Sequence, residues 1–302
     1  MLYICLPVYN TDVTRLANEL LVQSKNFPVE LLIVDDCSGS HFKQINSEFC
    51  KDKNQITYIS LPNNIGRSAI RNYFLGLKSK GYFLFLDGDS IIYRPNFIST
   101  YLELIEQKNP DLAFGGSCYQ KNRPSRNFML RWKYSTSRES KSLEVRLKNS
   151  FGFKTNNFLI NIEVFNQFPF NENIKGYGHE DTLFGFQLIQ KDFFPLQIDN
   201  PVLNEVLDEN LEFLVKTNNA IDNLVMINLD IEKSPEFVAH VRLLSSYHTL
   251  KKKKLLPLFN ACYFLVSGMN NFLLKKGCFF LWMFDAYKLQ RISKSFKAKA
   301  LV

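Results

Sequence analysis

Short apolar runs alternate with amphipathic stretches along the first 120 residues. The apolar runs predict strands, because buried parallel strands are apolar on both faces; they lie at 2–6, 29–34, 55–60, 82–86 and 112–114. The amphipathic stretches predict helices at 11–24, at 41–50, from 67 to about 78, and from Pro95 onward. Strands that alternate with helices predict an α/β fold with a mainly parallel, helix-covered sheet.

Polar side chains recur where three of these predicted strands end. Asn10 follows the first strand, Asp35 and Asp36 follow the second, and Asp87 and Asp89 follow the fourth. In open α/β sheets, ligands bind at the carboxyl ends of the strands. A loop origin explains each of these residues singly but not their recurrence, so we predict a ligand site at this edge.

Two carboxylates separated by one glycine, Asp87-Gly88-Asp89, directly follow the apolar strand 82–86. The glycine allows a tight bend, which lets both carboxylates converge on one point. Mg²⁺ and Mn²⁺ prefer such oxygen ligands and take only one or two carboxylates from the protein. Taken alone, the same three residues also fit an ordinary turn.

The second half of the chain is less regular. Residues 120–150 are rich in Arg, Lys and Ser and predict a long excursion with helical stretches. An apolar run at 158–160 predicts a strand, and the patterns at 182–190 and 209–228 predict helices.

Charge is distributed unevenly along the chain. From His240 onward twelve Lys and Arg residues face a single Asp, a net charge of +11, which leaves −3 for residues 1–239 out of the total of +8. Binding to nucleic acid would spread positive charge more widely, so we expect no nucleic-acid partner. The six cysteines include no close pair at metal-ligand spacing, and the chain opens on a strand rather than a signal peptide. We therefore expect reduced cysteines and a cytoplasmic protein.

The basic tail contains an uncharged stretch at 255–274, flanked by Lys251–Lys254 and by Lys275 and Lys276. Its length would allow a membrane span, but its asparagines and proline make it a poor one. Helices that lie in the membrane interface, anchored by lysines to anionic lipid, fit this mixture better. We expect a peripheral protein on the cytoplasmic face of the membrane, held by its C-terminal helices. The alternative is a helix pair packed on the rest of the protein.

The ordered set of motifs resembles family 2 glycosyltransferases of the GT-A fold. The residues that carry the resemblance are Leu6-Pro7-Val8-Tyr9-Asn10, Asp35-Asp36, Asn64-Ile65-Gly66-Arg67, Arg71-Asn72, Asp87-Gly88-Asp89 and Glu180-Asp181. The resemblance implies a GT-A domain at 1–230, with a nucleotide-binding half at 1–120 and an acceptor half at 121–230. Residues 231–302 would form a helical extension. The block Gly176–Thr182 also looks like the acceptor-side motif of galactosyl- and N-acetylhexosaminyl-transferases.

The resemblance implies a role for each matched residue. Asp89 would bind Mn²⁺ or Mg²⁺ directly, and Asp87 would contact the ribose or reach the metal through water. Asp36 would bond to the base of the nucleotide, commonly uracil, whereas for Asp35 a cap of the strand end is an equal alternative. The other expected contacts of the nucleotide-sugar are Pro7, Tyr9, Asn10, Gly66, Arg67, Arg71, Gly88, Asn156 and Gly178.

The two arginines, Arg67 and Arg71, are four residues apart, so on a helix they share a face and can reach a diphosphate. Solvated surface charge is the alternative for both. The choice among sugars would depend on the pocket side chains, with Thr155, Asn156 and Asn157 as candidates.

The acceptor side is assigned to Glu180 and Asp181. An acceptor hydroxyl needs a general base, for which Asp181 is our choice, with Glu180 on sugar hydroxyls. The alternative is that both acids stabilise the first turn of a helix. Gly176 and Gly178 would let the backbone approach a sugar, and Tyr177 would stack on it. For His179, a contact with the acceptor and a structural role are equal alternatives.

One position departs from the family pattern. Related enzymes often place a metal-binding histidine after the last core strand, where this chain offers Asn204, followed by Glu205. An amide oxygen is a weaker ligand, so the metal affinity would be lower.

The combined prediction is a metal-dependent, inverting glycosyltransferase. It would move a sugar from a nucleotide-sugar, with UDP as the expected nucleotide, to a hydroxyl of a glycan or a lipid-linked glycan. Two alternatives stay open. A nucleotidyltransferase also uses carboxylates and a metal at a sheet edge, although a glycine-rich basic loop would then be expected near the N-terminus. A non-catalytic nucleotide-sugar-binding protein of the same fold is suggested by Asn204 alone.

Overall fold

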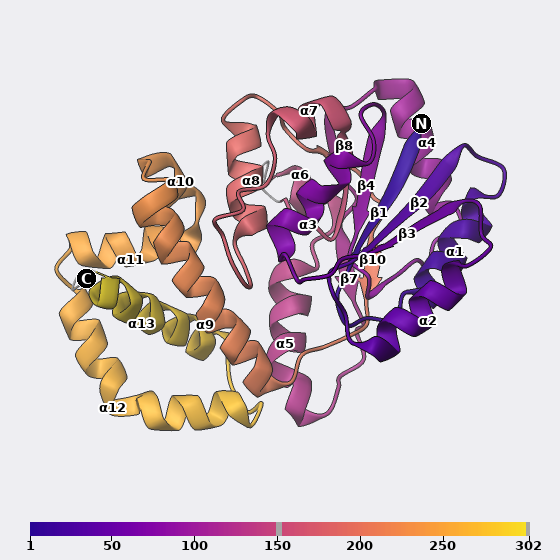
Figure 1. Ribbon diagram of the computed structural model, residues 1–302. Helices are drawn as coiled ribbons and strands as arrows, with labels where there is room; N and C mark the ends of the chain where they lie inside the picture. Colours follow the sequence, from indigo (N-terminus) through magenta and orange to yellow (C-terminus); the bar gives the residue numbers. More distant parts are fainter. Residues whose placement is uncertain (149–152, 300–302) are drawn as a thin grey trace. The chain divides into compact units, whose positions relative to one another are not determined.

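The computed structural model of the chain describes residues 1–148 and 153–299 (Figure 1). The chain forms two compact units, each made of separate segments. Unit 1 comprises Met1–Gln120, Glu139–Lys175 and Glu180–Val206, and unit 2 comprises Lys121–Arg138, Gly176–His179 and Leu207–Val302. The division at residue 230 that the sequence suggested stays a prediction.

Unit 1 is built on a seven-stranded sheet in the order β3-β2-β1-β4-β8-β6-β9. The first four strands in this order run parallel, and β8 is antiparallel to both of its neighbours. The strands are β1 (Leu2–Val8), β2 (Val29–Asp35), β3 (Ile56–Ser60), β4 (Tyr82–Leu86), β6 (Leu112–Phe114), β8 (Asn157–Asn161) and β9 (Leu196–Gln197). The predicted α/β class and mainly parallel sheet are therefore confirmed.

Helices cover both faces of this sheet. Successive side chains of each strand point to opposite faces, and in these strands the side chains on both faces are apolar and need cover. Ile4 and Leu6 of β1 pack with residues of α1 and α4 in one core, whereas Cys5 joins the second core with residues of α3, α7 and α8. The helices of unit 1 are α1 (Thr14–Ser24), α2 (Ser40–Cys50), α3 (Arg67–Tyr73), α4 (Phe97–Lys108), α6 (Leu143–Leu147), α7 (Ile162–Gln167) and α8 (Glu180–Ile189).

Helix α3 is shorter than the sequence pattern predicts. It ends at Tyr73 and passes into a 3₁₀ turn, η1 (Phe74–Gly76). Phe74 is fully buried and packs edge-on against Phe85 of β4, with ring centroids 5.4 Å apart. This packing fixes the end of α3 against the sheet.

Unit 1 also contains a second, three-stranded sheet, whose first strand follows β4 in the chain. It has the order β5-β10-β7 and consists of β5 (Ser90–Ile91), β10 (Val202–Asn204) and β7 (Ser117–Tyr119). β5 begins directly after Asp89, so this small sheet holds the segment that carries the Asp87-Gly88-Asp89 turn.

Unit 2 is helical over its described residues. Its helices are α5 (Met129–Tyr134), α9 (Asn210–Met226), α10 (Pro235–His240), α11 (Arg242–Lys252), α12 (Leu256–Lys275) and α13 (Leu281–Lys299), with a 3₁₀ turn η2 (Arg126–Phe128) and a π-helical turn η4 (Ile227–Ile231). Apolar side chains from α5, α9, α12 and α13 form its core. Within residues 1–148 and 153–299, no helix combines the length and apolar character that a membrane crossing requires.

Candidate active site at the carboxyl ends of the parallel strands

The predicted polar residues gather at one edge, because β2, β1 and β4 are parallel neighbours. After β1, the Asn10 backbone has a positive φ of 50°, and its N–H donates to Ser38 Oγ at 2.8 Å. Asn10 Oδ1 accepts from the N–H of Gly39 at 2.8 Å. The loop after β1 is thus tied to the loop after β2, while the Tyr9 side chain before it is exposed and Pro7 is half-buried.

Asp35, the last residue of β2, and Asp36, which follows it, are both buried and both hold loops in place. Asp35 accepts hydrogen bonds from the Ser38 N–H and the Tyr58 hydroxyl. Burial, and then the charge of Asp35, raises the pKa of Tyr58. The structure therefore supports the strand-end cap for Asp35.

Asp36 fixes the turn that starts α3. Its two carboxylate oxygens accept from the N–H groups of Ile65 (2.7 Å) and Gly66 (3.0 Å). Gly66 has a φ of 87°, a conformation that favours glycine, and it leads directly into Arg67. A contact of Asp36 with a nucleobase stays a prediction; in the structure its carboxylate places the arginine-bearing helix.

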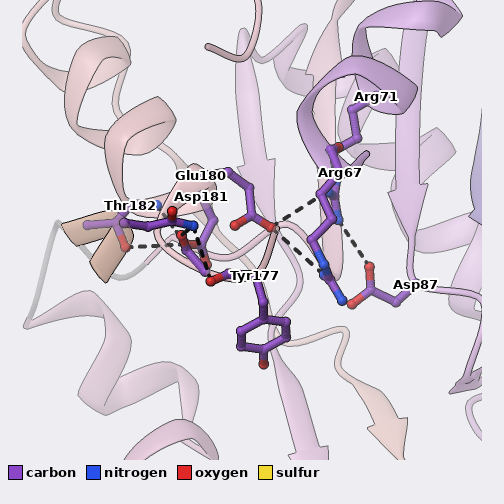
Figure 2. Close-up of polar contacts among 9 residues, drawn as sticks. Arg67, Arg71, Asp87, Tyr177, Glu180, Asp181 and Thr182 are labelled. Atoms are coloured by element: carbon purple, nitrogen blue, oxygen red, sulfur yellow. Dashed lines mark hydrogen bonds and ion pairs between the residues drawn. The ribbon is translucent and has the colours of Figure 1, made fainter. Parts of the chain in front are cut away.

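The two arginines of α3 face two carboxylates (Figure 2). Arg71 is only 2% exposed; its Nη2 lies 3.3 Å from Asp87 Oδ1, and its Nη1 lies 3.9 Å from Glu180 Oε1. Arg67 is half-exposed, and its Nη1 lies 3.8 Å from the same Glu180 oxygen. The helical spacing of four does place both arginines on one face, as predicted.

The two arginines of this cluster differ in burial and therefore in what they can contact. A buried charge is costly unless it is paired, so Arg71 is suited to fixing Asp87 and Glu180 rather than to reaching a solvated ligand. Arg67, with its exposed guanidinium, is the one that faces solvent beside Glu180. The predicted contacts of both with a diphosphate remain predictions.

Three buried polar atoms near this edge have no hydrogen-bond partner. They are Glu180 Oε2, Arg71 Nε and Asn156 Oδ1. Leaving such an atom unpaired costs about 1–3 kcal/mol, and native structures keep few of them without a reason. Two of the three belong to residues of the arginine–carboxylate cluster, which is typical of a site whose polar groups complete their bonds with a ligand.

The Asp-Gly-Asp turn lies beside the end of β10. Asp87 is half-buried and Asp89 is exposed. Asn204 pairs with Ser90, the residue after Asp89, in the antiparallel β10–β5 ladder. Asn204 is buried, and its role as a weak metal ligand stays a prediction.

The described residues do not form a complete metal-binding cluster of their own. Within 1–148 and 153–299 no group of three or more His, Cys, Asp or Glu side chains is arranged to hold a metal ion. Two carboxylates on one turn nevertheless fit a hard divalent cation that takes its remaining ligands from water and substrate phosphates. The donor set at Asp87 and Asp89 fits such a cation.

Asp181 stands in the first turn of α8, where an acid is favoured by the helix dipole. Its Oδ1 accepts from the backbone N–H of Thr182 at 2.7 Å and from the Thr182 hydroxyl at 3.2 Å (Figure 2). This contact matches the helix-start alternative for Asp181. The assignment of Asp181 as a base stays a prediction.

The glycine-rich approach to α8 belongs to unit 2. Gly178 has a φ of 100°, and a Cβ there would lie 2.5 Å from the Cβ of Ala220 in α9. Asn223 of the same helix donates to the carbonyl oxygens of Tyr177 and Gly178 at 3.3 and 3.2 Å. Packing on α9 therefore accounts for the glycine at 178, and a contact with a sugar stays a prediction.

Two further buried residues, Asn157 and Arg146, hold loops of unit 1 together. Asn157 is fully buried and donates to the carbonyl oxygens of Gly116 and Asn200, so it holds loops together instead of lining an open pocket. Arg146 was not singled out; it is buried and donates to the carbonyl oxygens of Gly115 and Ile198. Burial lowers the pKa of Arg146. Among the many basic residues of 120–150, no local signal marks it.

Comparison with known proteins agrees with this geometry. The fold is that of GT-A glycosyltransferases. The model of the family described as "Glycosyl transferase family 2" matches residues 3–172, and the chain belongs to this family.

Glycosyltransferase GlyG of Streptococcus pneumoniae is 24% identical over 204 residues, which cover 63% of this chain. The match spans 65% of that relative's length.

Solved structures show the fold at low sequence identity. A mannosyltransferase from Pyrobaculum calidifontis, in complex with GDP-mannose and Mn²⁺, aligns with a TM-score of 0.63 and 13% identity, over 97% of this chain and 86% of its own. TarS of S. aureus with UDP-GlcNAc aligns with a TM-score of 0.51 and 16% identity, over 99% of this chain and 92% of its own.

Proposed function

We propose that the protein transfers a hexose from a nucleotide-sugar to a hydroxyl of a glycan or lipid-linked glycan, with inversion at the anomeric carbon and with a divalent cation. The observation that carries the proposal is the meeting of Asp87, Arg67, Arg71 and Glu180 at the carboxyl edge of the sheet, with two unpaired buried atoms among them. Glycosyl transfer as such follows from the family.

The donor is proposed to bind across this edge. Tyr9 and Asn10, after β1, and Asp36, which accepts from the N–H of Gly66, are proposed to contact the nucleotide. The mannosyltransferase and TarS named above were solved with GDP-mannose and UDP-GlcNAc, which supports a nucleotide-sugar but does not choose between the two bases. We propose UDP as the nucleotide.

A divalent cation would be held by Asp89 and Asp87, with Asn204 as a weak third ligand, and when bound it would neutralise charge on the diphosphate leaving group. The Mn²⁺ in the Pyrobaculum mannosyltransferase supports the use of a divalent cation, whereas the choice of these ligands is our proposal. Arg71 contacts the Asp87 carboxylate and would hold it in one orientation toward the donor.

The protein's own acid–base step is assigned to Asp181. One oxygen of its carboxylate accepts from Thr182, and the other is proposed to accept the proton. In the proposed step the acceptor oxygen bonds to the anomeric carbon, the bond from that carbon to the diphosphate breaks, and Asp181 takes the hydroxyl proton. The block Gly176–Thr182 is proposed to meet an acceptor sugar, as in galactosyl- and N-acetylhexosaminyl-transferases.

Calorimetric titration with UDP tests the donor site. We expect binding that requires Mn²⁺ and disappears with EDTA. Asp89→Asn should weaken this metal-dependent binding, whereas Asp52→Asn, in an exposed turn, should not change it. Metal-independent binding of equal strength in both variants would contradict the assignment of Asp89.

Release of UDP from a panel of UDP-sugars, measured with and without candidate glycan acceptors, tests the transfer step. Asp181→Asn should nearly abolish acceptor-dependent release while UDP affinity stays near that of the unaltered protein. Near-normal turnover in Asp181→Asn would exclude this residue as the base.

A further inference from the structure

Two asparagines of helix α12 contact α13. Asn260 Nδ2 donates to Ser293 Oγ of α13 at 2.9 Å. Asn270 is buried, and its Nδ2 donates to the Tyr263 hydroxyl at 2.7 Å and lies 3.3 Å from the Met283 carbonyl oxygen. Asn260 and Asn270, two of the residues that make this stretch a poor membrane span, thus contact α13.

The outward side of α12 is apolar. Phe264 and Leu265 are 78% and 82% exposed. Other large apolar side chains of α12, of the turn that follows it and of the first turn of α13 are also exposed: Leu258, Val266, Met269, Phe272, Phe280 and Trp282. This set of eight residues is called the apolar face below.

A helix on a water-facing surface turns its apolar stripe to the core and its polar side to solvent. Helix α12 buries Asn270 together with Leu256, Tyr263 and Leu274, and it leaves large apolar side chains exposed on its other side. Scattered exposed apolar residues are common, but a continuous set on one helix marks a surface that binds something. The helix has 20 residues, so it is about 30 Å long. It does not qualify as a membrane span by composition.

The charges around α12 indicate what the apolar face binds. Lys251–Lys254 precede the helix, Lys275 and Lys276 end it, and all six side chains are exposed. No acidic residue occurs between Glu236 and Asp285. An anionic surface complements this arrangement. A second copy paired along the same face would bring lysines of both chains together, which is unfavourable.

We propose that α12 lies flat in the interface of a membrane that contains anionic lipid. The apolar face enters the boundary between head groups and acyl chains, and the lysines at both ends of α12 meet the lipid phosphates. Trp282 sits at head-group depth, where its ring and its N–H are both accommodated. The proposal concerns unit 2 and does not depend on which sugar or nucleotide unit 1 binds.

Vesicle flotation of the full chain tests the proposal. The protein should float with vesicles of phosphatidylcholine containing roughly one third phosphatidylglycerol, and float much less with pure phosphatidylcholine or at high salt. The double variant Phe264→Glu/Leu265→Glu should lose about tenfold or more of this partition, because two charges then enter the apolar boundary. Val22→Glu, an exposed apolar residue of α1, is the matched control and should float as the unaltered protein does.

Tryptophan fluorescence supplies a second measurement on the folded protein. The chain has two tryptophans, Trp132 and Trp282, so Trp132→Phe leaves Trp282 as the reporter. Its emission should shift to the blue with anionic vesicles and be quenched by brominated lipid. Donor binding measured on the same variants separates a failure of this proposal from a failure of the proposed function.

Three results would overturn the proposal. One is an unaltered protein that neither floats nor shows the shift of Trp282. Another is a double variant that floats as well as Val22→Glu does. The third is a stable dimer in lipid-free solution, seen by sedimentation and dissociated by Phe264→Glu/Leu265→Glu, because the apolar face would then belong to a second copy.

Discussion

The buried arginine at the site gives a test of the geometry that does not require a known substrate. Arg71→Met keeps most of the side-chain volume but removes the charge. Glu180, 7% exposed at its side chain, then loses a partner that lies 3.9 Å away, and Asp87 loses one at 3.3 Å.

The expected cost comes mainly from Glu180. Removing one partner of a buried ion pair costs about 3–5 kcal/mol, because it leaves a buried charge uncompensated. The contact from Arg71 to Glu180 is long and Arg67 stays near the same oxygen, so we expect the lower end, about 3 kcal/mol. Asp87 is one-third exposed, and water replaces much of what it loses.

The double variant Arg71→Met/Glu180→Gln distinguishes a specific pair from general damage to the core. Once Glu180 carries no charge, the loss of the arginine should cost about 1–2 kcal/mol less than in Arg71→Met alone. Urea unfolding followed by far-ultraviolet circular dichroism measures Arg71→Met, Glu180→Gln and the double variant. Tryptophan fluorescence is not used, because both tryptophans lie in unit 2 and do not report directly on unit 1. A loss below about 1 kcal/mol for Arg71→Met, or strictly additive effects of the two substitutions, would refute this reasoning.

Three further predictions follow from local structure. Gly178→Ala should destabilise unit 2 by about 2 kcal/mol, because it adds a Cβ beside Ala220 at a positive φ; thermal unfolding measures the loss. Burial, and then the charge of Lys251, lowers the pKa of His248 from 6.5. The free energy of unfolding should therefore fall as the pH drops below 6.5, and His248→Gln should flatten this pH dependence. Burial raises the pKa of Cys5, which should resist alkylation at pH 8 while exposed Cys262 reacts.

Each of the three has an outcome that speaks against it. Unchanged melting of Gly178→Ala would mean that the loop relaxes away from α9. For His248, the sign follows because the unfolded chain binds more protons than the folded one below pH 6.5; an acid dependence identical in His248→Gln would place its origin elsewhere. Mass spectrometry that finds Cys5 labelled as fast as Cys262 would show that unit 1 opens readily.

The sequence by itself determined the sheet and the edge where the site lies. Buried parallel strands are continuous apolar runs, so 82–86 was predicted with the bounds that β4 has. Residues at the ends of parallel neighbours must share one edge, which brought Asn10, Asp36 and Asp87 together without any distance being known. The fourfold spacing of Arg67 and Arg71 likewise fixed their common helix face.

Only the tertiary structure decided the partners of these residues. Burial of Arg71 beside Glu180, the bonds of Asp36 to the turn before α3, and the pairing of Asn204 with Ser90 join segments far apart in the chain. Such contacts depend on how the helices pack on the sheet, and the local sequence pattern of one segment does not determine this packing.

The same holds for α12. Its composition of asparagines and large apolar residues was visible, but which side turns outward was set by α13, because Ser293 and Met283 supply the partners that draw the asparagines inward. Periodicity gives a helix its two sides, and the element packed against it decides which of them meets solvent or lipid.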